Sequence, residues 1–184
     1  LRDDRRDRHS GRIWRITTKG KPVHPMPSIY GSSIDSLLDL LKRPEFRIRY
    51  LVKQELRKRN PEEVVVALDK WVGNLDSSET RFRHHQLEAL WCYRTVHANG
   101  RGVPLSPNRT DIAHRLLLDL LACEQHQARA AAVEQLRFWH SEFDDALDLL
   151  SRAANDPSSI VRMQAAICCS YVGTSEALEV LLQT

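Results

Sequence analysis

The sequence is poor in the residues and runs that mark several classes of protein. Its 184 residues include only 7 glycines and 8 prolines, which excludes a collagen-like or low-complexity chain. No apolar run approaches the ~18 residues that cross a bilayer, and no basic-then-apolar leader opens the chain. We therefore expect no direct membrane insertion. Since the first residue is Leu1, we also expect a fragment or a processed product, whose missing signals say nothing about compartment.

Cysteine is scarce, and its spacing excludes three kinds of site. The four cysteines are Cys92, Cys123, Cys168 and Cys169, and none belongs to a Cys-x-x-Cys motif. A zinc knuckle, a redox pair and a haem attachment motif are therefore absent from this sequence. Cys168 and Cys169 are adjacent in an apolar helical stretch, where free cysteine packs as a small hydrophobic residue. The sequence predicts buried thiols.

Motifs of catalysis and metal binding are also missing. The sequence contains no Gly-x-Ser-x-Gly, no glycine-rich phosphate loop, no dinucleotide fingerprint and no His-Glu-x-x-His. His84 with Glu88, and His140 with Asp144, have the i,i+4 spacing that could supply two metal ligands. A zinc site needs three or four. We predict no catalytic residue, no cofactor-binding residue and no metal ligand in this chain, and satisfied or solvated histidines.

Charge is unevenly distributed along the chain. Residues 1–60 hold 16 Lys and Arg against 7 Asp and Glu, a net charge of +9, whereas residues 61–184 hold 11 against 17, a net charge of −6. A basic arm can bind nucleic acid, but Asp3, Asp4 and Asp7 interrupt this one. A solenoid that binds DNA needs Lys and Arg clustered on one face. The sequence favours a solvated basic surface and no nucleic-acid partner.

The sequence predicts a helical protein that follows a single strand. Residues 11–18 alternate as a strand does, and residues 22–31 hold three prolines and Gly31, which is typical of a linker. A lone strand needs partners, so we expect residues 1–31 to be the last strand of a missing β domain plus a linker. From residue 32 the apolar period is helical. The predicted helices span about 33–42, 44–59, 61–75, 78–98, 110–123, 125–140, 142–154 and 158–172, with a ninth from Thr174.

The predicted helices form pairs, and the pairs repeat. The second helix of each pair carries an arginine followed seven residues later by an apolar residue; these are Arg49, Arg83, Arg129 and Arg162, spaced by 34, 46 and 33 residues. Residues 155–166 resemble the HEAT signature, Asp-Pro followed by Val-Arg and an alanine-rich helix. Periods of this size indicate stacked helix pairs. We therefore predict an all-α fold, a HEAT-like solenoid of about four pairs over residues 32–184, truncated at its C-terminus. We expect the recurrent arginine to reach an aspartate or the carbonyl end of a neighbouring helix.

Aromatic residues recur among leucines at helical spacing. They are Trp71, Trp91, Tyr93, Phe138 and Trp139. The spacing predicts that all of them pack in the core.

Three stretches resemble a known family of large multidomain proteins. Residues 7–17 with 19–22 are similar to a closing propeller strand and its exit, residues 85–91 to a mid-region helix, and residues 128–133, 145–150 and 154–157 to later repeats. The family is that of the planctomycete membrane-bound-dehydrogenase-like, haem-binding CxxCH proteins. In these proteins a β-propeller similar to quinoprotein sugar dehydrogenases precedes HEAT-like helices and often a c-type cytochrome domain.

This resemblance implies that the segment is a connector. It would be a non-catalytic scaffold that positions neighbouring domains of the same chain or binds a protein partner on its concave face. Haem c and a quinone cofactor would belong to the parent protein, not to this segment, and the setting would be extracytoplasmic or periplasmic. The resemblance leaves an alternative open, in which the parent is a quinoprotein-like sugar dehydrogenase with c-type haem electron transfer and this region contributes to its site. No propeller active-site residue and no Cys-x-x-Cys-His lies in the chain, so no catalytic or haem-ligating residue carries over.

Overall fold

The computed structural model describes residues 16, 18–20, 25–97 and 107–182, and these residues form α-helices and connecting turns without a strand. The helices of this described part are α1 (Ile34–Leu40), α2 (Phe46–Leu56), α3 (Pro61–Gly73), α4 (Phe82–His97), α5 (Pro107–Leu121), α6 (His126–Trp139), α7 (Ala146–Ala154), α8 (Ser159–Val172) and α9 (Ser175–Leu181). The prediction of an all-α helical repeat fold is confirmed. The strand expected over residues 11–18 lies outside the described residues except for Ile16 and Thr18, so it stays a prediction.

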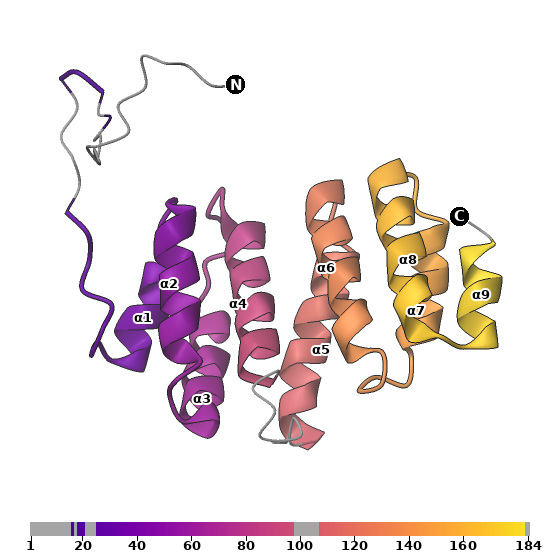
Figure 1. The fold of residues 1–184 in the computed structure, drawn as a ribbon, viewed down its shortest axis with the longest axis horizontal. Helices are drawn as coiled ribbons and strands as arrows, with labels where there is room; N and C mark the ends of the chain where they lie inside the picture. Colours follow the sequence, from indigo (N-terminus) through magenta and orange to yellow (C-terminus); the bar gives the residue numbers. More distant parts are fainter. Residues whose placement is uncertain (1–15, 17, 21–24, 98–106, 183–184) are drawn as a thin grey trace, which may run out of the picture.

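The helices stack as successive pairs in two layers. The second helices α2, α4, α6 and α8 pack against one another in that order, and Figure 1 shows them following one another along the longest axis of the molecule. The first helices α1, α3, α5 and α7 each pack beside them, and α9 extends the first layer by contacting both α7 and α8. The contact between α6 and α8 is the most extensive, so the C-terminal repeats are the most closely joined.

Several helix ends follow the signals in the sequence. Asn60 caps α3 by accepting a hydrogen bond from the backbone N–H of Glu62, and Pro61 is the first helical residue. Gly173 ends α8 in the left-handed conformation, with φ of 72°. Thr174 then caps α9 by accepting from the N–H of Ala177.

Four helix starts differ from the prediction. Helix α4 begins at Phe82 and not at residue 78, after a longer turn. Helix α2 begins at Phe46, after Glu45, and not at Pro44. Helix α5 begins at Pro107, earlier than expected, because proline at the first helical position gives up an N–H that has no partner there. Helix α7 begins at Ala146 and not at residue 142, since the side chain of Phe143 is buried beside Trp139 in the preceding turn.

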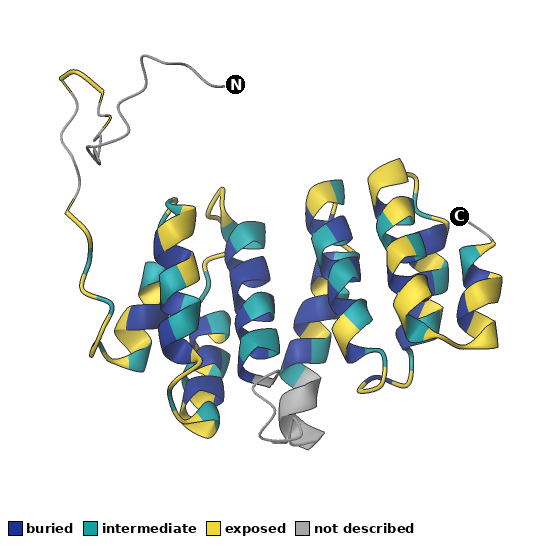
Figure 2. Ribbon diagram, viewed as in Figure 1, coloured by how far each residue is buried: buried dark blue, intermediate teal, exposed yellow. Residues whose placement is uncertain are grey.

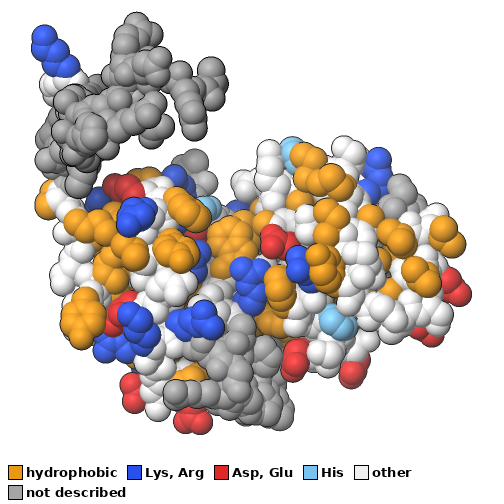
Figure 3. Space-filling view, viewed as in Figure 1, with side chains coloured by type: hydrophobic (Ala, Val, Ile, Leu, Met, Phe, Trp, Pro, Cys, Tyr) orange, Lys and Arg blue, Asp and Glu red, His pale blue; other side chains and the backbone are white. Residues whose placement is uncertain are grey.

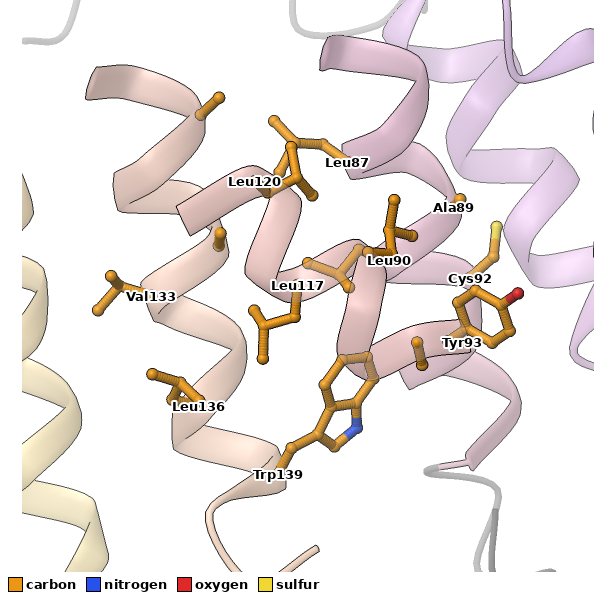
Figure 4. Packing of buried hydrophobic residues seen from close by; sticks show 14 of the residues in the cluster. Leu87, Ala89, Leu90, Cys92, Tyr93, Leu117, Leu120, Val133, Leu136 and Trp139 are labelled. Atoms are coloured by element: carbon orange, nitrogen blue, oxygen red, sulfur yellow. The ribbon is translucent and has the colours of Figure 1, made fainter. Parts of the chain in front are cut away.

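The core runs through the whole stack between the two layers. Figure 2 shows buried positions as dark patches along the stack, and Figure 4 shows Leu87 of α4 and Leu120 of α5 side by side, with Val133 and Leu136 of α6 facing the next repeat. Leu90, Leu117 and Leu136 are fully buried there. The four cysteines are buried and unpaired, as predicted. Each repeat therefore buries its apolar faces only against its neighbours.

The aromatic residues divide between core and surface. Trp71, Tyr93 and Trp139 are buried, as predicted. Phe138 is 43% exposed, and Trp91 only packs against the edge of the core. The prediction of a core position is wrong for Phe138, because residues adjacent on a helix point about 100° apart and Trp139 takes the inward direction.

Within the described part of the chain, no helix has both the length and the apolar character that crossing a membrane would require.

Candidate functional site

Three of the four predicted repeat arginines occupy the same place in their helices. Arg49, Arg129 and Arg162 are each the fourth residue of α2, α6 and α8. Each donates its Nη1 to two backbone carbonyls in the turn that precedes its helix. The acceptors are Arg43 and Pro44 at 2.8 and 2.6 Å, Cys123 and Glu124 at 2.9 and 2.8 Å, and Asp156 and Pro157 at 2.9 and 3.3 Å. The arginine thus fixes the angle between the two helices of its own repeat.

Two of these arginines also bind an acid of the next repeat. Arg129 donates from Nε and Nη2 to both carboxylate oxygens of Asp156, at 2.7 and 2.9 Å. Asp156 accepts from Arg162 as well, through its backbone carbonyl, so it joins two successive repeats. Arg49 donates from Nε to Glu88 Oε1 at 2.8 Å. The sequence predicted that the arginine reaches an aspartate or the carbonyl end of a neighbouring helix; Arg129 contacts an aspartate, whereas Arg49 contacts a glutamate.

The Arg129–Asp156 contact also shifts the titration of both groups. The hydrogen bonds from Arg129 lower the pKa of the Asp156 carboxyl, helped by the backbone N–H of Ser158 and opposed by partial burial. The same hydrogen bonds raise the pKa of Arg129. This pair is therefore charged at neutral pH, and its bidentate geometry is the strongest that arginine and a carboxylate can form.

Arg83 does not share this geometry. It is the second residue of α4, where it donates to Gln86 Oε1 at 2.8 Å and lies over the ring of Phe82. The fourth residue of α4 is His85, which is buried with Nδ1 3.3 Å from Glu79 Oε2. Burial lowers the pKa of His85, although Glu79 partly opposes the shift. The predicted register is two residues off in this repeat, because the turn before α4 is longer than the others.

A buried carboxylate joins α2 to α4. Glu88, with 1% of its side chain exposed, accepts from Arg49 and from Lys53 Nζ at 2.8 Å each. His84 Nε2 lies 3.4 Å from the same carboxylate. Burial lowers the pKa of His84 despite Glu88, so His84 is neutral at neutral pH. Arg49, Lys53 and Glu88 thus form an ion network that joins α2 to α4.

The histidines do not assemble a metal centre in the described residues, where no group of three or more His, Cys, Asp or Glu side chains is placed to hold an ion. His140 turns its Nδ1 to the carbonyl of Arg137 at 3.3 Å. His114 Nε2 lies 3.0 and 3.1 Å from the two carboxylate oxygens of Asp145, and its ring stacks on Phe143 at 4.5 Å. Sequence spacing gave no signal for this pair, because the two residues are 31 positions apart.

The second helices present cations stacked on aromatic rings. Lys53 Nζ lies 5.0 Å from the ring centre of Trp91, and the guanidinium of Arg94 lies 4.6 Å from that of Phe138. Arg137 lies 5.2 Å from Phe138 and 3.6 Å from Tyr171. We call these six residues, contributed by α2, α4, α6 and α8, the cation–aromatic row. They were not predicted as a group, since each contact joins residues of different helices or exposes a ring expected in the core.

A shallow groove accompanies the N-terminal half of the row. It has a volume of about 400 Å³ and lies between α2, α4 and α6, with Tyr50, Lys53, Trp91, Arg94 and Glu134 among its lining residues. The buried Glu88 network forms part of this lining. Figure 3 shows Lys and Arg side chains set among hydrophobic ones across the middle of one face of the molecule. Such a surface can bind a ligand through apolar contacts and electrostatic attraction.

Comparison with known proteins supports the repeat architecture. Residues 115–184 match the family model of HEAT repeats, which covers the C-terminal part of α5 and all of α6 to α9. No curated protein and no solved structure gave a match. The predicted relationship to dehydrogenase-like, haem-binding proteins therefore stays a prediction. The fold and this match together identify an α-helical repeat protein whose residues 115–184 are similar to HEAT repeats.

Proposed function

We propose that residues 32–184 are a non-catalytic scaffold, which holds neighbouring domains of a larger chain in position and offers a surface to a protein partner. The observation that carries this proposal is the Arg129–Asp156–Arg162 connection, in which one aspartate joins two successive repeats. A scaffold needs such joints, because each helix pair contacts only its neighbours and every joint sets the shape of the stack. HEAT repeats suggest the same role.

The chemistry of the described residues supports a scaffold over an enzyme. Two buried charged groups, Arg49 and Glu88, are hydrogen-bonded to each other, and Arg49 also donates to a carbonyl of its own repeat. The buried thiols of Cys92 and Cys168 have a raised pKa, which disfavours the reactive thiolate. A catalytic site is expected to hold groups whose pKa is shifted toward the reactive protonation state.

The finer proposal concerns the parent protein. On the strength of the sequence resemblance, the scaffold would lie between a dehydrogenase-like β-propeller and a c-type haem domain, in an extracytoplasmic setting. Haem c and a quinone would then belong to the neighbouring domains. The alternative, that this region contributes to the site of a quinoprotein-like sugar dehydrogenase, has its support in surface aromatics such as Phe138.

A distance measurement tests the scaffold. Spin labels on Asp39→Cys and Glu179→Cys, exposed in α1 and α9, should give one narrow distance distribution by pulsed electron resonance. The native thiols are buried and should react slowly during labelling. Arg129→Met should broaden the distribution, because it removes the joint between α6 and the turn before α8. A distribution already broad in the labelled protein without that substitution would overturn the rigid scaffold.

Two measurements test the proposal about the parent protein: sequencing of the flanking gene and analysis of the purified segment for haem and metal. Sequencing on both sides of this segment should find a propeller upstream and Cys-x-x-Cys-His downstream. The purified segment should be colourless and free of stoichiometric metal while fully helical by circular dichroism. A bound haem or metal in the segment would refute the non-catalytic role and favour the alternative.

A further inference from the structure

The centre of the cation–aromatic row holds two guanidinium groups beside one ring. Arg94 comes from α4 and Arg137 from α6, and both lie within 5.2 Å of the Phe138 ring centre. Arg137 also stacks on Tyr171 of α8 at 3.6 Å, which is the closest cation–ring contact in the described part of the chain. Stacking engages the faces of a guanidinium and leaves the N–H groups at its edge directed outward. The aromatic rings thus hold two donor groups in place.

The two positive charges are incompletely neutralised. Glu134 Oε1 lies 3.8 Å from Arg94 Nη1, which is too long for a hydrogen bond. Within the described residues, no acid forms an ion pair with Arg137. Arg94 and Arg137 are close enough to repel: burial and then Arg137 lower the pKa of Arg94, and Glu134 opposes them. Two fixed cations against one carboxylate favour the approach of a further anion.

An apolar strip borders this charged pair. On α8 the side chains of Ile160, Met163, Ile167 and Tyr171 are exposed by 39–55% of their surface. The last three are spaced four residues apart and so lie on one face of the helix. Arg162 is the one Lys, Arg, Asp or Glu of α8, and its Nη1 is engaged with two backbone carbonyls. A ligand that bridges α4 to α8 would therefore meet cations first and then apolar surface.

We propose that the C-terminal part of the row binds an acidic peptide segment of a protein partner, with a carboxylate on Arg94 and Arg137 and large apolar side chains on Met163, Ile167 and Tyr171. This inference rests on the proposed scaffold function and names the chemistry of its partner. Arginine binds carboxylates through paired N–H donors. An aromatic and arginine centre with an apolar surround is typical of the residues that dominate protein interfaces.

The same surface suits nucleic acid poorly. A phosphate backbone needs several cations along its path. Glu134 lies beside Arg94, and α8 offers no free cation next to Tyr171. An acidic and apolar peptide fits both parts of the surface.

Peptide selection tests the proposal. A phage-displayed library of random 12-residue peptides is selected in parallel on the wild-type chain and on the Arg94→Gln/Arg137→Gln variant. Peptides from the wild type should be enriched in Asp and Glu together with Leu, Phe or Trp, and this acid enrichment should disappear on the variant. The strongest peptide, synthesised with a fluorescent label, should bind the variant at least 10-fold more weakly by anisotropy.

The control is an arginine substitution at a distant position of the same chain. Arg152→Gln removes an exposed arginine of α7, in the other layer, and should change peptide affinity less than 2-fold. Thermal melts of all variants establish that they are folded. An equal content of Asp and Glu in the peptides selected on the wild type and on the Arg94/Arg137 variant would overturn the proposal. Peptides from the wild type without enrichment in Asp and Glu would overturn it as well.

Two further outcomes would also overturn it. One is a single-stranded 20-nucleotide DNA that binds the same arginines more tightly than the best peptide. The other is a dimer in sedimentation that the Arg94/Arg137 substitution dissociates, since the occupant would then be a second copy. The spin-label distance is measured independently of the peptide selection. A failed selection would therefore overturn the peptide site and not the rigid scaffold. A broad distance distribution would overturn the scaffold whatever the selection finds.

Discussion

At the scale of single residues, direction on a helix decides what a side chain does. Phe138 and Trp139 are neighbours of similar character, yet Trp139 is fully buried and Phe138 is 43% exposed. Trp139 packs edge-to-face on Phe143 in the core, while Phe138 supports two guanidiniums on the surface. A pattern of leucines and aromatics cannot separate the two roles, because both residues border the same apolar stripe.

Leu90 tests the core at this scale. It is fully buried on α4, and Figure 4 shows it pointing toward Leu117 of α5. We expect Leu90→Ala to lower the free energy of unfolding by roughly 2–5 kcal/mol, because it removes apolar contacts and leaves a cavity. Urea unfolding followed by circular dichroism measures the change.

A matched substitution on the surface provides the control for Leu90. Val66 is 43% exposed on α3, and Val66→Ala should cost less than about 1 kcal/mol. Equal effects of the two substitutions would mean that Leu90 is not enclosed by its neighbours.

At the scale of elements, the turns between helices determine how the repeats join. Arg49, Arg129 and Arg162 each bond the carbonyls of the turn before their own helix. The turn before α4 is longer, and His85 takes the equivalent helical position with Glu79 as its partner. The fourth position of each second helix therefore recurs along this chain. It is arginine where the preceding turn is short and histidine where the turn is longer.

Gly173 tests the end of α8. Its φ of 72° lies in the left-handed region, and a Cβ added there would meet nothing within 4 Å. Gly173→Ala should therefore destabilise the protein by about 1 kcal/mol through backbone strain alone. Thermal or urea unfolding of the purified variant measures this cost.

Gly73 is the matched control for Gly173. It ends α3 without a positive φ, and a Cβ added to it would likewise meet nothing within 4 Å. Gly73→Ala should be neutral or stabilise by up to about 1 kcal/mol, since alanine favours helix more than glycine does. If both substitutions cost the same, the left-handed cap does not explain the Gly173 result.

Asp156 tests the joint between repeats through pH. Arg129 lowers the pKa of its carboxyl below the usual value near 4. The stability from this group is therefore complete above pH 4 and is lost as the pH falls through the lowered pKa. Asp156→Asn should cost about 1–3 kcal/mol at pH 7, the range for hydrogen bonds to charged groups, and the gap to the wild type should narrow toward pH 2.

Urea unfolding at several pH values measures the Asp156 effect. Asp119, exposed on α5, supplies the control, and Asp119→Asn should change stability by less than about 0.5 kcal/mol at every pH. A gap for Asp156→Asn that stays constant from pH 7 to pH 2 would show that the carboxylate charge plays no part in the joint.

At the scale of the whole molecule, the second helices form one continuous layer, and each first helix packs against that layer. Figure 1 shows this elongated arrangement, and Figure 2 shows that burial continues from one repeat to the next. The extensive contact between α6 and α8 lies inside the segment that matches HEAT repeats. The N-terminal repeats keep the architecture but depart in turn length and in the Arg83 position.

The reactivity of the four thiols tests whether the whole stack stays closed in solution. All four cysteines are buried, and burial raises the pKa of Cys92 to about 12 and that of Cys168 to about 11. We expect fewer than one thiol per chain to react with Ellman's reagent within minutes at pH 8, and all four to react in 6 M guanidinium chloride, because the thiolate is the reactive form. Rapid reaction of the folded protein would show that the stack opens locally around α4 or α8.

The sequence alone is sufficient to predict the helical class, the pairing of helices and most helix ends. These follow from local physics: the 3.6-residue apolar period, the cap at Asn60 and the left-handed glycine at residue 173 act within one turn of chain. It also located the arginines that fix the turns, at Arg49, Arg129 and Arg162.

The contacts between residues of different helices follow from tertiary packing. Glu88 gains Arg49 and Lys53 from 39 and 35 positions away, and Arg137 meets Tyr171 from the next repeat. The register of α4 followed the length of its preceding turn, which shifted the repeat position from Arg83 to His85. Such contacts depend on how whole repeats stack, and stacking is set by the sum of many side-chain volumes rather than by any local pattern. The cation–aromatic row, and with it the surface proposed for a partner, exists because four second helices lie side by side.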